Sequence, residues 1–430
     1  MNGSRMAMVL WTVALAVPAL AQAQASPYDE IRGEVAALAE RVGRLEAENR
    51  TLRQRNDDLE RRMAALQAPA GEPPVVAEAS VASAAAPGMA PGDAPEPDLA
   101  LSESTPTRPA TPWYDRLEVS GYVFGDAYAV LDHHDPEIED RTGFWIRRGY
   151  LTFDADVADE WSARLRFEVN SPGDFTTDAK MDPFVKDAYL AWKHGGRELD
   201  LGLSSSPTFE FVEGFWGQRA LEKTPLDLYR LGSSRDLGVA YKGSARDDRI
   251  FYHAMLGNGS GDGSETNDGK KIMASLGFRP TKALAAQVYA DYEDRPGATD
   301  RRTLQAFVGW NGSRARYGLQ YAVQERKVEA GPDDEIAVAS AFGVWRLMEQ
   351  GTLIVRYDRS FDGYPDANRI AYLRIADDMR FDLAILAWEQ RLQKKISLIP
   401  NLEYVRYRDT EGRPAPGDDL YGRLTLYYQF

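Results

Sequence analysis

The chain has 430 residues and contains no cysteine, which excludes disulfides, thiolate metal sites and cysteine nucleophiles. Its formal net charge of -15 argues against nucleic acid as a partner, because a phosphate backbone requires a basic protein surface. The length fits one large domain or two to three ordinary ones, so the organisation has to be inferred from patterns along the chain.

Residues 1–25 have the features of a secretory signal peptide. Arg5 precedes an apolar run, and small residues follow that run at Ala21, Ala23 and Ala25. A retained membrane anchor fits less well, because the run is short for a spanning helix and an A-x-A site follows directly. No later stretch approaches the roughly 18 uncharged apolar residues of a spanning helix, so any passage through a membrane would use strands.

Residues 28–67 carry an unbroken heptad pattern, which predicts a coiled coil. Val at the a positions with Leu at d favours two strands, whereas Asn49 and Asn56 at a leave the number open. A lone amphipathic helix is the alternative. Three pairs of opposite charge flank the seam and favour a parallel, in-register homo-oligomer: Arg41 with Glu46, Glu48 with Arg53, and Arg55 with Glu60.

Residues 68–112 are rich in Pro, Ala and Gly and show no hydrophobic period. Such a composition predicts an extended linker. It would separate the coiled coil from a body that spans residues 113–430.

The body alternates apolar and polar residues in the manner of β-strands. Between Trp161 and Val169, one face is apolar while the other carries charges in the middle of the strand. Seven short and eight long connections take turns along the body and would join 16 strands. Short gaps centre near residues 159, 196, 247, 281, 313, 350 and 393.

Strict alternation of short and long connections is typical of outer-membrane barrels, with periplasmic turns and extracellular loops. The predicted fold class is therefore all-β, a 16-stranded antiparallel transmembrane β-barrel in the outer membrane of a Gram-negative bacterium. Both ends of the body, and hence the coiled coil, would lie on the periplasmic side.

The last strand, DLYGRLTLYYQF, presents Leu426, Tyr428 and Phe430 on the face that suits lipid. We expect Phe430 to lie at the periplasmic interface, where aromatic rings are favoured. These three residues would form the signal by which outer-membrane proteins are recognised for assembly. An ordinary edge strand is the alternative.

A barrel of 16 strands is too wide for its own side chains to fill, and it encloses an aqueous lumen. The expected function is passive diffusion of small solutes, with selectivity set by charges at a constriction. The third long connection, about 204–235, is the longest and is rich in aromatic residues. We expect it to fold inward and narrow the lumen.

Several stretches form a recognisable set: FWIRRGYLTFDADVADEWSARLRFEVN, DAYLAW, SSRDLGVAYKG, ISLIPNLEY and LTLYYQF. As a set, from about Trp113 to Phe430, they resemble the phosphate-selective porins of the O and P type. The resemblance implies a homotrimer with an arginine-lined path and an anion site at loop three. It implies passage of small anions, with phosphate or polyphosphate as candidates, and assigns a trimer to the coiled coil.

The resemblance places a basic pair near the constriction at Arg147 and Arg148, and a basic residue after loop three at Arg235. Alternation points Arg148 inward and leaves Arg147 facing out or in a bulge. Loop three adds three candidate cations without a direct match: Arg219, Lys223 and Arg230. Alternation also directs further arginines to the lumen, each expected to pair with a carboxylate: Arg164, Arg166, Arg316, Arg326, Arg356 and Arg423.

The charge of the body favours a second hypothesis. Residues 113–430 hold 41 basic and 51 acidic side chains. Much of the acidic excess lies in loops such as DHHDPEIED and GPDDE, where it would repel anions at the mouth of the channel. A general or weakly cation-selective porin, tethered to peptidoglycan through its coiled coil, is therefore the alternative.

Enzymatic and metal-dependent functions have little support in the sequence. The chain has four histidines, His133, His134, His194 and His253, and their predicted places bring none of them to a common site with a serine and an acid. The pair His133–His134 stands beside Asp132 and Asp135, but such a cluster on an exposed loop is more often solvated. We therefore predict no enzyme activity, no metal and no cofactor.

Overall fold

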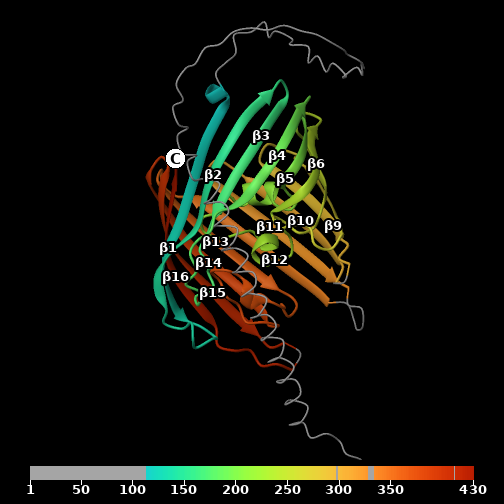
Figure 1. Cartoon of the computed structure of the whole chain (residues 1–430). Coiled ribbons are helices and arrows are strands. Elements are labelled where there is room, and N and C mark those ends of the chain that lie inside the picture. The colour runs from blue at the N-terminus through green and yellow to red at the C-terminus, as the bar shows by residue number, and fades with distance from the viewer. Residues whose placement is uncertain (1–112, 297–298, 328–333, 411) are drawn as a thin grey trace, which may run out of the picture. The chain divides into compact units, whose positions relative to one another are not determined.

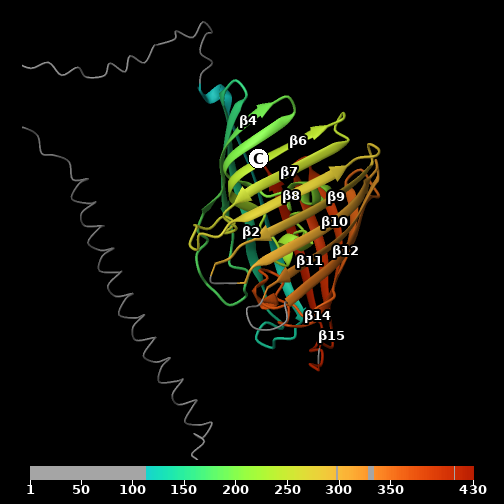
Figure 2. The ribbon, with the colours of Figure 1, turned by 90° about the vertical axis from the view of Figure 1, so that its right-hand side faces the viewer.

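The computed structural model describes residues 113–430 except 297–298, 328–333 and 411. Sixteen antiparallel strands form a closed barrel in which each strand pairs with its neighbours along the chain and β1 pairs with β16 (Figures 1 and 2). The predicted fold class of the body is confirmed. The predicted signal peptide, coiled coil and linker lie outside the described residues.

A 3-10 turn, η1 (Trp113–Arg116), precedes the barrel. The first eight strands are β1 (Leu117–Asp132), β2 (Thr142–Ala158), β3 (Trp161–Val169), β4 (Phe184–His194), β5 (Arg197–Ser205), β6 (Arg235–Ala245), β7 (Ile250–Gly257) and β8 (Lys271–Phe278). The last eight are β9 (Leu284–Glu293), β10 (Arg301–Asn311), β11 (Ala315–Arg326), β12 (Asp334–Arg346), β13 (Gly351–Ser360), β14 (Arg380–Gln393), β15 (Ile396–Arg408) and β16 (Asp419–Gln429).

The strand boundaries put the short and long connections at opposite ends of the barrel. All seven predicted short gaps fall between paired strands, from 159–160 after β2 to 394–395 after β14. The eight long connections fall at the other end, as the alternation predicts. We name the two ends of the barrel the turn end and the loop end.

The outer wall has the composition of a lipid-facing surface. On β10, Leu304 and Val308 on the outer face are exposed, whereas Thr303 on the inner face is buried. Exposed rings border this apolar band on both sides: Trp310 and Tyr317 toward the turn end, and Tyr292, Tyr321 and Tyr357 toward the loop end. Such girdles mark the interfaces of membrane barrels. Within the described part of the chain, no helix is long and apolar enough to cross a membrane.

A β-bulge in β2 explains how two successive arginines face inward. Phe124 of β1 pairs with Arg148, but the next residue, Gly125, pairs with Ile146, so Arg147 is the extra residue. A Cβ at Gly125 would lie 2.3 Å from the carbonyl oxygen of Trp145, and the bulge therefore requires glycine there. Of the two predicted alternatives for Arg147, the structure has the bulge.

The connection after β5, residues 206–234, lies within the barrel and contains two short helices, α2 (Glu210–Trp216) and α3 (Pro225–Leu228) (Figure 1). Thr224 in extended conformation and Pro225 at the first helical position begin α3. Trp216, Leu221, Leu226, Leu228 and Tyr229 of this loop three are almost completely buried.

Side chains from three walls hold the backbone of loop three. Arg147 of β2 donates to Leu221 O at 2.7 Å, and Arg316 of β11 donates to Trp216 O at 2.8 Å. On β13, Arg356 donates to the carbonyl oxygen of Lys223. In the order of strands around the barrel, β2 lies across from β11 and β13, so the loop crosses the lumen.

Loop seven, residues 361–379 between β13 and β14, also packs inward, which the sequence analysis did not predict. Ile370, Leu373 and Ile375 are buried, and a short 3-10 turn, η2 (Ala367–Arg369), lies within the loop. The Tyr372 hydroxyl donates to Arg147 O at 3.0 Å, and Arg423 of β16 donates to the Tyr372 carbonyl. Loops three and seven thus meet at the same wall.

Glu222 of loop three forms ion pairs with the wall where loops three and seven meet. Its carboxylate lies 2.7 Å from Arg147 Nη2 and 3.7 Å from Arg423 Nη1. Arg423 also lies 2.7 Å from Glu403, and all four side chains are almost completely buried. A charge in such a place is stable only while its partners remain.

We expect Glu222→Gln to destabilise the folded barrel by about 3 kcal/mol, because it leaves part of a buried positive charge uncompensated. Urea unfolding in lipid vesicles would measure the free energy. Glu160→Gln is the matched control, since Glu160 is about half exposed in the β2–β3 turn. Equal stability of the two variants would contradict the role assigned to Glu222.

A second prediction concerns the junction of β1 and β16, where Phe430 N donates to Gly121 O at 3.0 Å. The Phe430 ring lies over Gly121, where an added Cβ would be 2.3 Å from Cζ. We expect Phe430→Ala to lower the yield of folded barrel in vesicles, measured by heat-dependent electrophoretic mobility. Phe361→Ala, at a similarly exposed ring, should leave the yield unchanged. If both variants fold equally well, Phe430 has no special role in assembly of the barrel.

Candidate functional site: two cavities beside loop three

A cavity of about 590 Å³ opens between loop three and the loop end of the barrel. Nine basic and four acidic side chains line it. Four of the basic residues were predicted from the sequence, namely Arg148, Lys223, Arg230 and Arg235. The other five were missed: Lys186, Lys271, Arg295, Arg301 and Arg369.

The four predicted cations differ in how firmly they are paired. Arg148 forms an ion pair with Glu168, and Arg235 forms one with Asp187. Lys223 Nζ lies 3.4 Å from Asp227. Arg230 is exposed, and among the described residues it has no ion pair.

Lys223 lies in loop three, outside the spanning strands. Burial lowers the pKa of Lys223, Asp227 raises it, and Arg148 and Arg219 lower it further, so that it falls to about 8. A quarter of the side chain is nonetheless exposed, so the ammonium group faces the cavity. For Asp227, burial raises the pKa, but Lys223 and Arg219 lower it more, so the net direction is down.

One of the missed cations, Lys186, lies at a β-bulge, as Arg147 does. In β4, Arg166 pairs with Asp187 and Phe167 pairs with Val185, which leaves Lys186 as an inward-pointing bulge residue. Lys186 Nζ lies 3.3 Å from both Glu168 and Asp262. No sequence pattern marks such a position, because a bulge breaks the period of two.

Lys271 and Arg301 begin β8 and β10, and alternation could have placed them inward. Lys271 Nζ lies 3.2 Å from Asp291 and from Glu293. Arg301 differs, because its Nε is buried without a hydrogen-bond partner among the described residues. Arg295 and Arg369 belong to loops, where periodicity gives no signal.

A second cavity, of about 850 Å³, lies on the other side of loop three and opens at the turn end. Its lining also has more basic than acidic side chains: Lys193, Arg197, Lys242, Arg279 and Lys282 against Glu198 and Glu210. Phe211 and Phe251 form its apolar part, and Arg279 lies 3.9 Å from the ring centre of Phe251. The acidic excess of the body is therefore not on either lining.

The remaining predicted arginines lie away from both cavities. Arg147 is buried against loop three, and Arg219 lies 2.6 Å from Asp227 within that loop. Arg164 bonds both oxygens of Asp154, at 2.6 and 3.0 Å, and Arg166 lies 3.0 Å from Asp187. Arg356 and Arg423 also pair with carboxylates, whereas Arg316 bonds a loop-three carbonyl and Arg326 bonds Gln324.

One histidine lies nearer to a serine and an acid than the sequence analysis expected. His253, Ser275 and Glu210 line the turn-end cavity together, and His253 Nδ1 is 3.7 Å from Glu210. Among the described residues, however, Ser275 Oγ has no hydrogen-bond partner. A serine nucleophile requires a bond to its base, and this group does not provide one.

No protein-family model and no curated protein sequence matches the chain. Solved structures do. The anion-selective porin from Comamonas acidovorans is similar with a TM-score of 0.57 at 14% identity, over 73% of this chain and 99% of that chain. The OmpF–daunomycin complex of Salmonella typhi gives 0.55 at 10% identity, over 74% and 99% of the two chains.

The outer membrane channel DcaP of Acinetobacter baumannii is similar with a TM-score of 0.52 at 16% identity, over 73% of this chain and 97% of that chain. At such identities, likeness establishes a fold only, and the resemblance to phosphate-selective porins stays a prediction. The closed barrel of this chain has the fold of the outer-membrane porins.

Proposed function

We propose that the chain is an outer-membrane porin through which small anions diffuse passively. The observation that carries this proposal is the charge of the two cavity linings. Basic side chains outnumber acidic ones on both, in a body that is net acidic. The alternative of a cation-selective porin requires the reverse distribution.

Position, rather than total charge, decides which ions enter a narrow path. Charges in a cleft with low-dielectric walls focus the field on the solute, whereas charges on exposed loops are screened by salt within about 8 Å. Paired cations such as Arg148 and Arg235 contribute a weaker electrostatic field in the cavity, because a neighbouring carboxylate partly cancels their charge. Arg230 and Arg301, which have no ion pair among the described residues, would contribute more.

Phosphate is the narrower candidate within this proposal. Lys223, Arg230 and Arg235 lie on the loop-three side of one cavity, and together they offer ammonium and guanidinium donors suited to a phosphate oxyanion. The printed name of one similar structure, an anion-selective porin, supports the broader class. It does not bear on phosphate.

We extend the proposal to a homotrimer, with residues 28–67 as a periplasmic coiled coil. The heptad pattern and its charged flanks support self-association. A similar solved structure is described as a trimer form. Whether the coiled coil contacts peptidoglycan is a separate part of the hypothesis.

The proposal predicts an anion preference in reversal potentials across planar bilayers holding the purified protein in a chloride gradient. Arg301→Gln and Arg230→Gln should each lower the anion-to-cation permeability ratio by roughly threefold, the effect of removing a potential of about 1 kT. Arg246→Gln, in an exposed turn that lines neither cavity, is the control.

A cation preference of the unmodified protein would contradict the proposal and favour the general porin. Phosphate added to one side tests the narrower candidate. Block of the chloride current that weakens in Arg230→Gln supports phosphate binding, whereas unchanged current supports anion diffusion without it.

Lys223 gives a prediction for pH. With a pKa of about 8, its side chain is charged below pH 8 and neutral above it. The anion preference should therefore fall as the pH rises from 7 to 9. Lys223→Arg should remove this step, because a guanidinium stays charged throughout that range. The same step in Lys223→Arg would show that another group titrates.

A further inference from the structure

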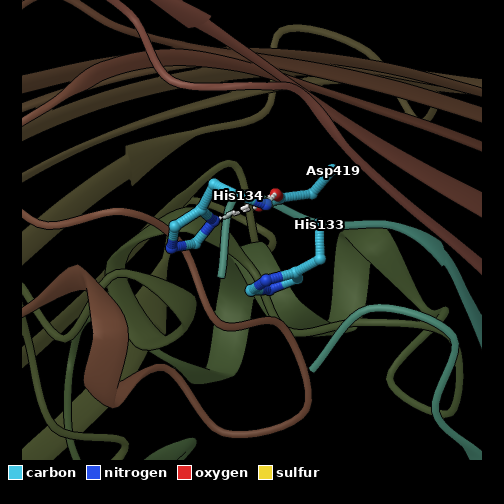
Figure 3. A group of neighbouring side chains, drawn as sticks. All are labelled: His133, His134 and Asp419. Atoms are coloured by element: carbon cyan, nitrogen blue, oxygen red, sulfur yellow. Dashed lines mark hydrogen bonds and ion pairs between the residues drawn. The ribbon is translucent and has the colours of Figure 1, made fainter. Parts of the chain in front are cut away.

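His133 and His134 follow β1 at the loop end, and the proposed channel makes no use of them. The sequence analysis paired them with Asp132 and Asp135 on an exposed loop. The structure instead brings them to Asp419, the first residue of β16 (Figure 3). His133 is only 5% exposed, so solvation does not account for this pair.

Asp419 is fully buried and accepts hydrogen bonds from several donors. The backbone amide of His134 lies 2.7 Å from Oδ1, and His134 Nδ1 lies 2.9 and 3.1 Å from the two carboxylate oxygens. The hydroxyl of Tyr407, on β15, donates to Oδ2. The carboxylate is thus held in a fixed orientation toward His134.

One ring nitrogen of His133, Nε2, takes no part in this hydrogen-bond arrangement. Its Nδ1 accepts a hydrogen bond from Asp135 N at 2.9 Å and also lies 3.2 Å from Asp135 O. Its Nε2 is buried without a hydrogen-bond partner among the described residues. On metal binding, the proton of His133 would lie on Nδ1 and be donated to Asp135 O, in place of the bond from Asp135 N. The lone pair of Nε2 would then be left for the ion, which is the usual arrangement of a metal-binding histidine.

The donor set suits a borderline transition metal. One ligand atom from each of His133, His134 and Asp419 lies within 4.8 Å of the other two. Ligands bound tetrahedrally to Zn²⁺ stand about 3.3 Å apart, given metal–ligand bonds of about 2.0–2.1 Å. The distance between His134 Nδ1 and Asp419 is already close to that value, and the stacked rings of His133 and His134 lie 4.3 Å apart.

We propose that His133, His134 and Asp419 bind one divalent transition-metal ion, with Zn²⁺ as the representative. The ion would replace the proton between His134 Nδ1 and Asp419, and this proton would move to Nε2, so that His134 binds as a neutral imidazole. A water molecule would complete the coordination, and Tyr407 would keep its hydrogen bond to the carboxylate. Bound there, the ion would fasten loop one, residues 133–141, to β16 across the junction that closes the barrel.

The surrounding charges allow a cation. Nη1 of Arg374 in loop seven lies 3.7 Å from Asp135, whose carboxylate is not one of the three ligands. Asp135 therefore balances Arg374, while Asp419 remains to balance the metal.

The first test measures zinc bound to the tag-free, full-length protein in detergent after removal of metals with a chelator. The chain has four histidines, so background binding is small. We expect one zinc per chain, with affinity at least tenfold weaker in His134→Asn and in Asp419→Asn. His194→Asn, whose imidazole is exposed and pairs with Glu160, should bind as the unmodified chain does. Unchanged affinity in the two site variants, or loss in His194→Asn, would overturn the proposal.

A second measurement needs no variant and remains valid if a substitution prevents folding. Diethylpyrocarbonate modifies histidine nitrogens, and mass spectrometry can locate the product. Zn²⁺ should protect His134, the more exposed of the two site histidines, at least fivefold while leaving His194 reactive, and Co²⁺ in its place should give visible absorption of a nitrogen-ligated site. Equal modification of His134 with and without Zn²⁺ would refute metal binding at this site.

Discussion

Closure of the sheet is the constraint on which the other features of this molecule depend. A strand in lipid cannot leave backbone groups unpaired, so the hydrogen-bond ladder must run without an edge from β1 through β16 and back to β1. Once the sheet is closed, alternate side chains have one of two environments. Leu304 and Val308 face lipid, and Thr303 and Gln305 face the interior. Charged side chains at inward positions then find partners inside, with exceptions such as Arg301, and this produces the ion pairs of the lumen.

Those interior partners explain why the net charge of the body differs in sign from the charge of its two cavity linings. Acidic residues of the wall mostly neutralise basic neighbours, as Glu168 does for both Arg148 and Lys186. Loops three and seven fill the side of the barrel near β1, β2 and β16, where Glu222 and Tyr372 bond Arg147 and Arg423. The open space is left beside β4, β8 and β10, whose inward cations border it. Under the proposed function, selectivity would be set in this sector of the barrel.

The period of two along each strand allowed the strand number, the order of connections and the lipid-facing residues to be predicted. Successive side chains of a strand point to opposite faces, so the pattern is visible in the sequence itself. The positions of Lys223 and Arg230 followed from their place in one long loop, and that of Arg235 from its place directly after this loop. Lys186 could not be predicted, since a bulge carries no signature in a single sequence. The inward packing of Tyr372 and the approach of Asp419 to His134 depend on contacts between residues 200 or more positions apart, which a local pattern does not contain.

The two bulges have an implication for how such channels diverge. Arg147 and Lys186 each add an inward cation to a strand while the strands on either side keep their pairing. A single inserted codon can thus alter the electrostatics of a pore in one step, without exchanging any residue of the existing lining. Alignments that compare only matched inward positions would miss that change, and two barrels with identical matched linings could then differ in the ions they admit.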